Sequence, residues 1–232
     1  MGKKRLKKKT LTISEICSEI EQIIKIKYRS LKLVSDDDKL RLKGIFPIID
    51  PENGSEIDRY KIEIEFHPDY PVNMPILRET QGRIPRTIDR HIVGDDGRAC
   101  LFVREEGYRR LSQNPSIISF IEGPVYQFLL SQSYYELTGD WLFGEWAHGP
   151  AGVFEFYSEI LETEDPKIIL TFVKYLSNKE IRNYWRCYCG SGRKLKKCHL
   201  TFMYKIRNQI PSFIADDTYK YILSHLKSNK TN

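Results

Sequence analysis

Three cysteines and one histidine lie within thirteen residues near the end of this 232-residue chain, and this cluster constrains its folding more than any other feature. In chain order the four residues are Cys187, Cys189, Cys198 and His199. Three thiols and one imidazole are a full tetrahedral ligand set for Zn²⁺, and Gly190 and Gly192 allow the backbone to fold back after the first pair. We therefore predict one structural zinc ion, with no ligand position left open for catalysis.

The same run of residues matches a known motif. Its Cys-x-Cys-Gly-Ser-Gly start at residues 187–192 and its terminal Cys-His at 198–199 resemble the SEC-C motif known from the C-terminus of the SecA translocation ATPase. The resemblance covers about thirteen residues and fills every ligand position. It implies the zinc site, but it leaves open whether the module binds a protein or nucleic acid or only holds together a tail too small for its own core.

The remaining cysteines, Cys17 and Cys100, lie far apart, and a total of five is unlike a disulfide framework. We therefore expect reduced thiols and a cytoplasmic location. No run approaches the ~20 consecutive apolar residues that cross a bilayer. The lysine-rich start is not followed by the apolar segment of a secretory signal. The sequence thus predicts no membrane association.

Charge is unevenly distributed along the chain. Residues 1–9 carry a net charge of +6 and residues 187–232 carry +7, whereas residues 10–186 carry −7. A basic tail could serve nucleic acid, but a short lysine run is more often a solvated arm, and we favour that interpretation. We predict a basic flexible arm at 1–9 and a mildly acidic globular body.

Apolar periodicity predicts an amphipathic helix over Leu11–Lys27, with Thr12 and Glu15 as a capping box. Three strands are predicted after it as an antiparallel meander, at Tyr28–Val34, Leu40–Ile49 and Tyr60–Phe66. Residues 67–99 contain four prolines and little periodicity, which predicts a long ordered loop of functional importance.

Helical periodicity returns after Asn114-Pro115 and continues to Leu129, with a break or kink expected at Gly123-Pro124. Further helices are predicted at Gly152–Leu161 and Ile168–Leu176. A polar stretch then leads into the cysteine cluster and its basic tail. These elements predict an α+β fold in three parts: the arm at 1–9, a main domain at 10–178 and a zinc-binding tail at 179–232.

The second candidate site is Cys100, in Gly97-Arg98-Ala99-Cys100-Leu101 and nine residues after His91. A first helix, a meander and the segment Tyr70-Pro71-Val72-Asn73-Met74-Pro75 precede it, and helices follow it. This order resembles the ubiquitin-conjugating enzyme fold over roughly residues 11–165. The similarity is greatest to the bacterial ubiquitin-conjugating-like proteins of antiphage (CBASS-type) operons, which also encode a cGAS-like cyclase.

The resemblance implies that Cys100 carries the C-terminus of a protein as a thioester and passes it to an acceptor amine. The carried protein would be a ubiquitin-like modifier or the cyclase. His91 stands at the histidine of the family's His-Pro-Asn, but Ile92-Val93 replaces Pro-Asn. In the family the Asn side chain is assigned to supporting the loop or the oxyanion. His91 could act as a base or orient the loop, and a structural histidine is an equal alternative.

Three functions remain open at this point. The chain contains no P-loop or G-x-G-x-x-G, so a transferase would need a separate activating enzyme or a pre-activated substrate. The alternative is a catalytically inactive conjugating-fold module that docks a partner through its zinc tail. A cysteine hydrolase using Cys100 and His91 would need an orienting third residue that the sequence does not identify. The presence of Cys100 leads us to favour the transferase.

Overall fold

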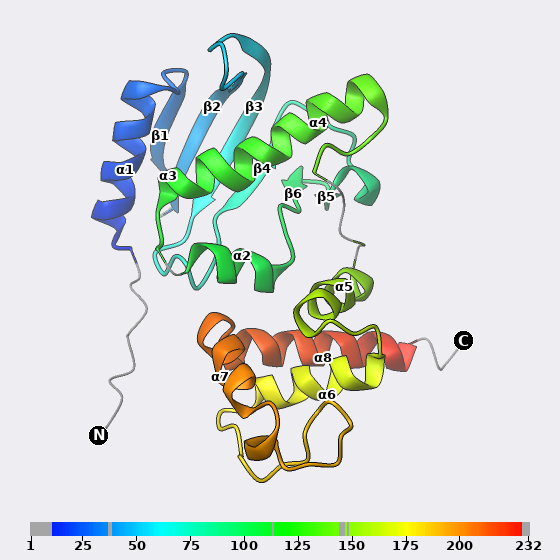
Figure 1. The fold of residues 1–232 in the computed structure, drawn as a ribbon. Helices are drawn as coiled ribbons and strands as arrows, with labels where there is room; N and C mark the ends of the chain where they lie inside the picture. The colour runs from blue at the N-terminus through cyan, green and yellow to red at the C-terminus, as the bar shows by residue number, and fades with distance from the viewer. Residues whose placement is uncertain (1–10, 37–38, 113, 144–146, 148, 229–232) are drawn as a thin grey trace. The chain divides into compact units, whose positions relative to one another are not determined.

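The computed structural model describes residues 11–36, 39–112, 114–143, 147 and 149–228. The chain divides into two compact units (Figure 1). Unit 1 comprises Met1–Phe102 and Arg110–Glu145, and unit 2 comprises Val103–Arg109 and Trp146–Asn232. The predicted arm at 1–9 lies outside the described residues.

Unit 1 has an α+β fold built on an antiparallel sheet with the strand order β1-β2-β3-β4-β6-β5. The strands are β1 (Leu31–Asp36), β2 (Lys39–Ile49), β3 (Glu56–Phe66), β4 (Ile76–Glu79), β5 (Ile92–Val93) and β6 (Arg98–Ala99). The predicted meander is confirmed as β1 to β3. Along β3 the side chains of Tyr60, Ile62 and Ile64 are buried, because the strand alternates apolar and polar residues and one face covers the core.

The expectation of an irregular stretch over 67–99 was wrong in part. This stretch contains β4, the 3₁₀ turn η1 (Ile88–Arg90) and the hairpin of β5 and β6. Strands of two to four residues are too short to show an alternating pattern in the sequence. They form here because they extend an existing sheet, β4 against β3 and β6 against β4.

Helix α1 (Ile13–Ile26) confirms the first predicted helix and its capping box. The Thr12 amide donates to Glu15 Oε2 at 2.8 Å, and the Glu15 amide donates to Thr12 Oγ1 at 3.2 Å. Figure 1 shows α1 alongside β1, and the helical run α3 to α4 crossing one face of the sheet. The buried residues of these helices, including Ile16 and Ile20 of α1 and Phe120 of α3, join the inner face of the sheet in one hydrophobic core.

The helix predicted after Asn114-Pro115 consists of α3 (Ile117–Phe120), the π turn η2 (Ile121–Val125) and α4 (Tyr126–Thr138). Its N-cap is Ser116, whose hydroxyl accepts from the Ser119 amide at 3.2 Å. The break expected at Gly123-Pro124 is a π turn, because the wider turn accommodates the proline ring and its missing N–H without ending the helix.

Unit 2 is helical. It contains α5 (Pro150–Leu161), α6 (Pro166–Ser177), the 3₁₀ turn η3 (Leu195–Lys197), α7 (Leu200–Gln209) and α8 (Ser212–Ser228), together with Val103–Arg109, which includes the first six residues of α2 (Arg104–Leu111). Helices α5, α6 and α8 pack against one another. The boundary expected at 178/179 therefore falls inside unit 2, because α5 and α6 share their buried faces with the C-terminal helix.

None of the helices among the described residues has the length and apolar character needed to cross a membrane.

Gly97, three residues before Cys100, approaches β4 too closely for a side chain. Its φ is 73°, and a Cβ there would lie 2.3 Å from the Glu79 carbonyl oxygen. Gly54 has the same φ of 73° with nothing within 4 Å of its would-be Cβ. We expect Gly54→Ala to cost about 1 kcal/mol of stability and Gly97→Ala at least about 3 kcal/mol, measured by urea unfolding. Equal losses of stability in the two variants would show that the close approach of Gly97 to β4 does not contribute.

A carboxyl group is buried in unit 2. Glu105 is 1% exposed and accepts from the hydroxyls of Thr218 on α8 and Tyr157 on α5. Burial raises the pKa of Glu105, while the Thr218 hydrogen bond acts in the opposite direction. A carboxyl whose pKa is raised on folding stabilises the fold below its unfolded pKa, near 4.3, and this contribution is lost as pH rises through the folded pKa.

Glu105→Gln should therefore stabilise unit 2 at pH 7–8 by about 1 kcal/mol and have little effect near pH 4, because glutamine keeps an acceptor without the charge. Thermal unfolding at the two pH values measures the difference. Glu164→Gln, at an exposed position of unit 2, is the control. A destabilisation at pH 7–8 would contradict the raised pKa of Glu105.

Candidate functional site

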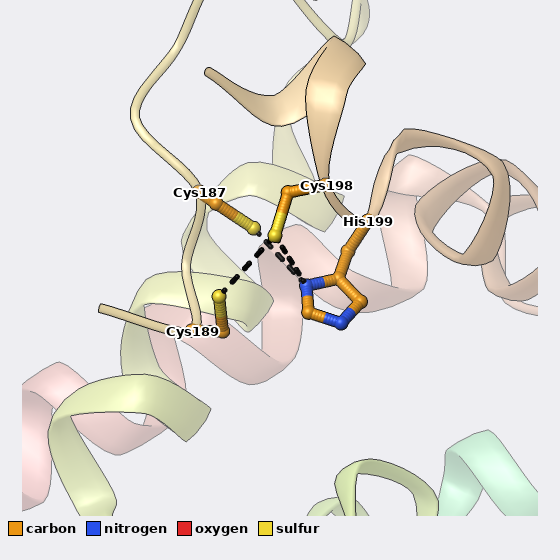
Figure 2. Close-up of side chains that lie close together, drawn as sticks. All are labelled: Cys187, Cys189, Cys198 and His199. Carbon is orange, nitrogen blue, oxygen red and sulfur yellow. Dashed lines mark hydrogen bonds between the residues drawn. The ribbon is translucent and has the colours of Figure 1, made fainter. Parts of the chain in front are cut away.

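The predicted metal ligands come together in unit 2. Cys187, Cys189, Cys198 and His199 each offer one ligand atom, and these atoms all lie within 4.8 Å of one another (Figure 2). His199 Nδ1 lies 3.2 Å from Cys187 Sγ and 3.3 Å from Cys198 Sγ, and the sulfurs of Cys189 and Cys198 are 3.7 Å apart. Figure 2 shows the four side chains pointing toward a common centre.

These spacings fit a tetrahedral metal site. With metal–sulfur and metal–nitrogen bonds of about 2.3 and 2.1 Å, the edges of a tetrahedron are about 3.8 Å between sulfurs and about 3.6 Å from sulfur to nitrogen. The observed sulfur–sulfur edge matches, and the sulfur–nitrogen edges are slightly short. A separation of 3.7 Å is far beyond the ~2.05 Å of a disulfide, and all the cysteines are free thiols. The cluster is therefore suited to a metal ion and not to cross-linking.

Two antiparallel segments hold the ligand loop in place. The Leu195 amide donates to the Trp185 carbonyl at 2.7 Å, and the Cys187 amide donates to the Arg193 carbonyl at 2.8 Å. Gly190 and Gly192 have φ values of 76° and 72°, which allow the chain to reverse between these segments. Tyr188, between the first two ligands, packs its ring edge against Phe172 of α6 and so anchors the loop to unit 2.

The thiols of the cluster differ in acidity. Burial opposes ionisation of Cys189, but hydrogen bonds from Ser191 and the neighbouring thiols outweigh it and lower its pKa to about 6. Burial raises the pKa of Cys187 to about 11, and the nearby sulfurs add to this effect. The hydrogen bonds of the cluster therefore favour a thiolate at Cys189, and metal binding would displace the protons that remain on the other thiols.

In unit 1, Cys100 and His91 are brought together by the backbone. Ile92 pairs with Ala99 in the β5–β6 hairpin, and the next N–H, that of Cys100, donates to the His91 carbonyl at 2.7 Å. The two residues are thus directly opposite one another at the end of the hairpin. Cys100 is exposed and His91 is partly buried. The eight intervening residues therefore form the hairpin that places the backbones of the two candidate residues side by side.

His91 is held in an unusual conformation. Its φ of 52° and ψ of 33° lie in the left-handed region, which costs a residue with a side chain about 1–2 kcal/mol. Its ring meets the ring of Trp141 edge-on at 5.0 Å, and Trp141 lies 4.7 Å from Tyr135 of α4. The Arg90 guanidinium lies over the Tyr135 ring at 4.6 Å. Sequence reasoning missed Trp141 because no motif links residue 141 to the loop at 91.

Two charged residues near Cys100, Arg98 and Asp96, influence its thiol and its turn. Packing around its sulfur raises the pKa of the Cys100 thiol, although the residue as a whole is exposed, and the positive charge of Arg98 acts against this increase. Asp96 accepts from Arg78 Nε at 2.8 Å, which lowers its pKa, and its other oxygen accepts from the Arg98 amide. Asp96 therefore supports the turn that leads to Cys100.

Comparison with known protein families matches residues 186–201 to the SEC-C motif. Comparison with curated proteins and with solved structures gives no match. The matched residues include all four members of the cluster, so the motif and the side-chain geometry agree independently. Residues 186–201 thus form a SEC-C motif whose three thiols and imidazole are arranged to hold a metal ion.

Proposed function

We propose that unit 1 is a ubiquitin-conjugating-like transferase domain that carries the C-terminus of a protein on Cys100. The observation that carries this proposal is the pairing of an exposed cysteine with a histidine across the β5–β6 hairpin. A histidine in the left-handed region adds support, since strained backbone is concentrated at functional sites. The order of helix, meander, loop and helices agrees with the sequence resemblance.

The chemistry has two steps. The Cys100 thiolate attacks the activated carbonyl carbon of the carried C-terminus, an S–C bond forms, and the activating group leaves with its electron pair. An acceptor amine then attacks the same carbon, a C–N bond forms, and Cys100 leaves as a thiolate while the amine gives up a proton. In this proposal His91 takes that proton or holds the loop beside Cys100.

The Arg98 charge gives the loading step a testable pH dependence. Because Arg98 opposes the raised pKa of Cys100, Arg98→Gln should raise that pKa further and reduce the thiolate fraction. We expect loading up to about tenfold slower at pH 7–8, and the two rates should converge only at a pH above the raised pKa of both thiols, where both are ionised. Arg29→Gln, at an exposed position of unit 1, is the control. A difference that persists at high pH would assign Arg98 another role.

For unit 2 we propose Zn²⁺ as the metal of the SEC-C motif. Three thiolates and one imidazole favour zinc over the oxygen-preferring ions Mg²⁺ and Ca²⁺. Four protein ligands leave no open position, so the ion would supply folding energy and no chemistry. The cytoplasmic setting proposed for this chain, where thiols stay reduced, suits such a site.

The alternative is an inactive conjugating-fold module that binds partners without carrying them, and the raised pKa of Cys100 favours it. A loading assay separates the two. The full chain is incubated with ATP, a candidate activating enzyme and its carried protein, or with ubiquitin bearing a preformed C-terminal thioester. We expect an adduct that excess thiol removes, and Cys17→Ala should load normally. Stable association without a thiol-sensitive adduct would support the binding module.

A further inference from the structure

The two antiparallel segments that flank the ligand loop of unit 2 are strongly basic. Residues 182–197 contain six Lys and Arg residues and no Asp or Glu. The six are Arg182, Arg186, Arg193, Lys194, Lys196 and Lys197, and all are exposed. A run of this density without acidic residues departs from the mixed charge of an ordinary solvated surface.

These residues are gathered by the fold as well as by the sequence. Segments 182–186 and 193–197 lie antiparallel, joined by the Arg186–Lys194 bridge and by the Lys196 amide donating to the Asn183 carbonyl at 2.9 Å. We call the surface of these two segments the basic knuckle. Among the described residues, none of its six cations forms an ion pair with a carboxylate. Arg193 Nη2 also donates to Cys198 Sγ at 3.2 Å, but no carboxylate of the described residues competes with an anionic partner for the six charges.

Aromatic rings lie between the cations. Tyr184 is 55% exposed, and the Arg182 guanidinium donates to its hydroxyl at 2.9 Å. Trp185 is partly exposed and is supported from behind by Tyr175 at 4.5 Å. Exposed rings interleaved with cations suit unpaired bases, which stack on rings while the phosphates meet the charges. We propose that the basic knuckle binds single-stranded nucleic acid, independently of the chemistry proposed for unit 1.

Other anionic partners fit this surface less well. Membrane-binding surfaces insert tryptophan, phenylalanine or leucine. In 182–197 the one tryptophan, Trp185, is only partly exposed and packs against Tyr175, and the strongly exposed large side chain is that of Tyr184. An acidic protein segment would use the cations but would gain little from stacking on Tyr184. Duplex nucleic acid keeps its bases stacked internally, so it too would leave the ring unused.

The test measures binding of the full, metal-loaded chain to fluorescent single-stranded DNA and RNA of about 20 nucleotides by anisotropy. Parallel arms use the corresponding duplex, phosphatidylserine vesicles and polyglutamate. If all six cations contact phosphates, affinity should fall about 300-fold between 50 and 200 mM salt, from a slope of about −0.7 per contact. Comparing the affinities for single-stranded DNA and RNA shows whether the 2′-hydroxyl of the sugar contributes to binding.

Two variants separate charge from stacking. Lys194→Gln/Lys196→Gln/Lys197→Gln should reduce the same salt-induced loss to about 20-fold, because three contacts are removed. Its control, Lys25→Gln/Lys32→Gln/Lys61→Gln, removes three exposed charges from unit 1. Tyr184→Ala should weaken binding about 5- to 150-fold without changing the salt slope, because it removes a stacking ring. Tyr134→Ala, at an exposed tyrosine of α4, is its control.

Metal content and thermal unfolding of every variant confirm that the knuckle is intact. Unchanged binding in both knuckle variants would overturn the proposal, because the N-terminal lysines remain present in each. Tighter binding to the duplex, the vesicles or polyglutamate than to either single strand would also overturn it.

Discussion

Removal of the metal should unfold the SEC-C loop while leaving unit 1 intact. The four ligands come from both segments of the loop at 187–199, so a bound ion would tie these segments together in addition to their backbone hydrogen bonds. Structural zinc contributes about 10–16 kcal/mol of apparent binding energy in zinc-finger peptides at pH 7. After chelation, hydrogen exchange at the amides of Cys187, Leu195 and Lys196, which are hydrogen-bonded in the loop, should become fast.

Two comparisons make this result specific. Cys189→Ser should reproduce the effect of the chelator, and Cys17→Ser, on α1, should have none. The paired amides of β2 and β3 should keep their protection, because they belong to unit 1. Metal analysis of the untreated chain should give about one zinc per chain. Retained protection of the loop amides in a metal-free chain would show that the cluster is held by packing alone.

Cys100→Ala should abolish loading completely and leave the fold unchanged. Residue 100 as a whole is exposed, so removing its sulfur costs little packing, and the hydrogen bond from residue 100 to the His91 carbonyl is made by the backbone. Cys100→Ser should form a slower but more stable oxyester that resists thiol. Urea unfolding checks the fold, and gel electrophoresis with and without reductant checks the adduct. Loading that survives in Cys100→Ala would place the nucleophile elsewhere.

The metal centre could be predicted from the sequence almost completely. Its ligands lie within thirteen residues, so local spacing determines which atoms meet, and the structure brings all four together. The cysteine site was harder, because it depends on a hairpin whose strands have two residues each. The sequence indicated His91 and Cys100 as partners through resemblance, but not the backbone pairing that joins them. The Trp141 contact depends on the path of the chain after α4, which no local pattern encodes.

The sequence predicted the long amphipathic helices and strands of the fold, but not the short strands or the helices of strongly basic composition. The helix at α1 shows both periodicity and a capping box, and β2 and β3 alternate over many residues. Helices α7 and α8 were missed because the basic composition of the tail obscured their apolar residues. Yet Met203, Ile206, Ile210 and Ile214 recur at helical spacing and are buried. Helices α5 and α6 precede the predicted tail yet belong to the same unit, which the pattern within the tail does not show.

The central claim is that Cys100 carries a protein C-terminus, and the mass of the loaded chain tests it most directly. Intact-mass spectrometry of the wild-type chain, after incubation with ATP, an activating enzyme and the carried protein, should show a species heavier by the carried protein less one water. Peptide mapping should locate it at Cys100, and excess thiol should remove it. No adduct with any activating enzyme or preformed thioester donor, or an adduct that resists thiol and persists in Cys100→Ala, would contradict the claim.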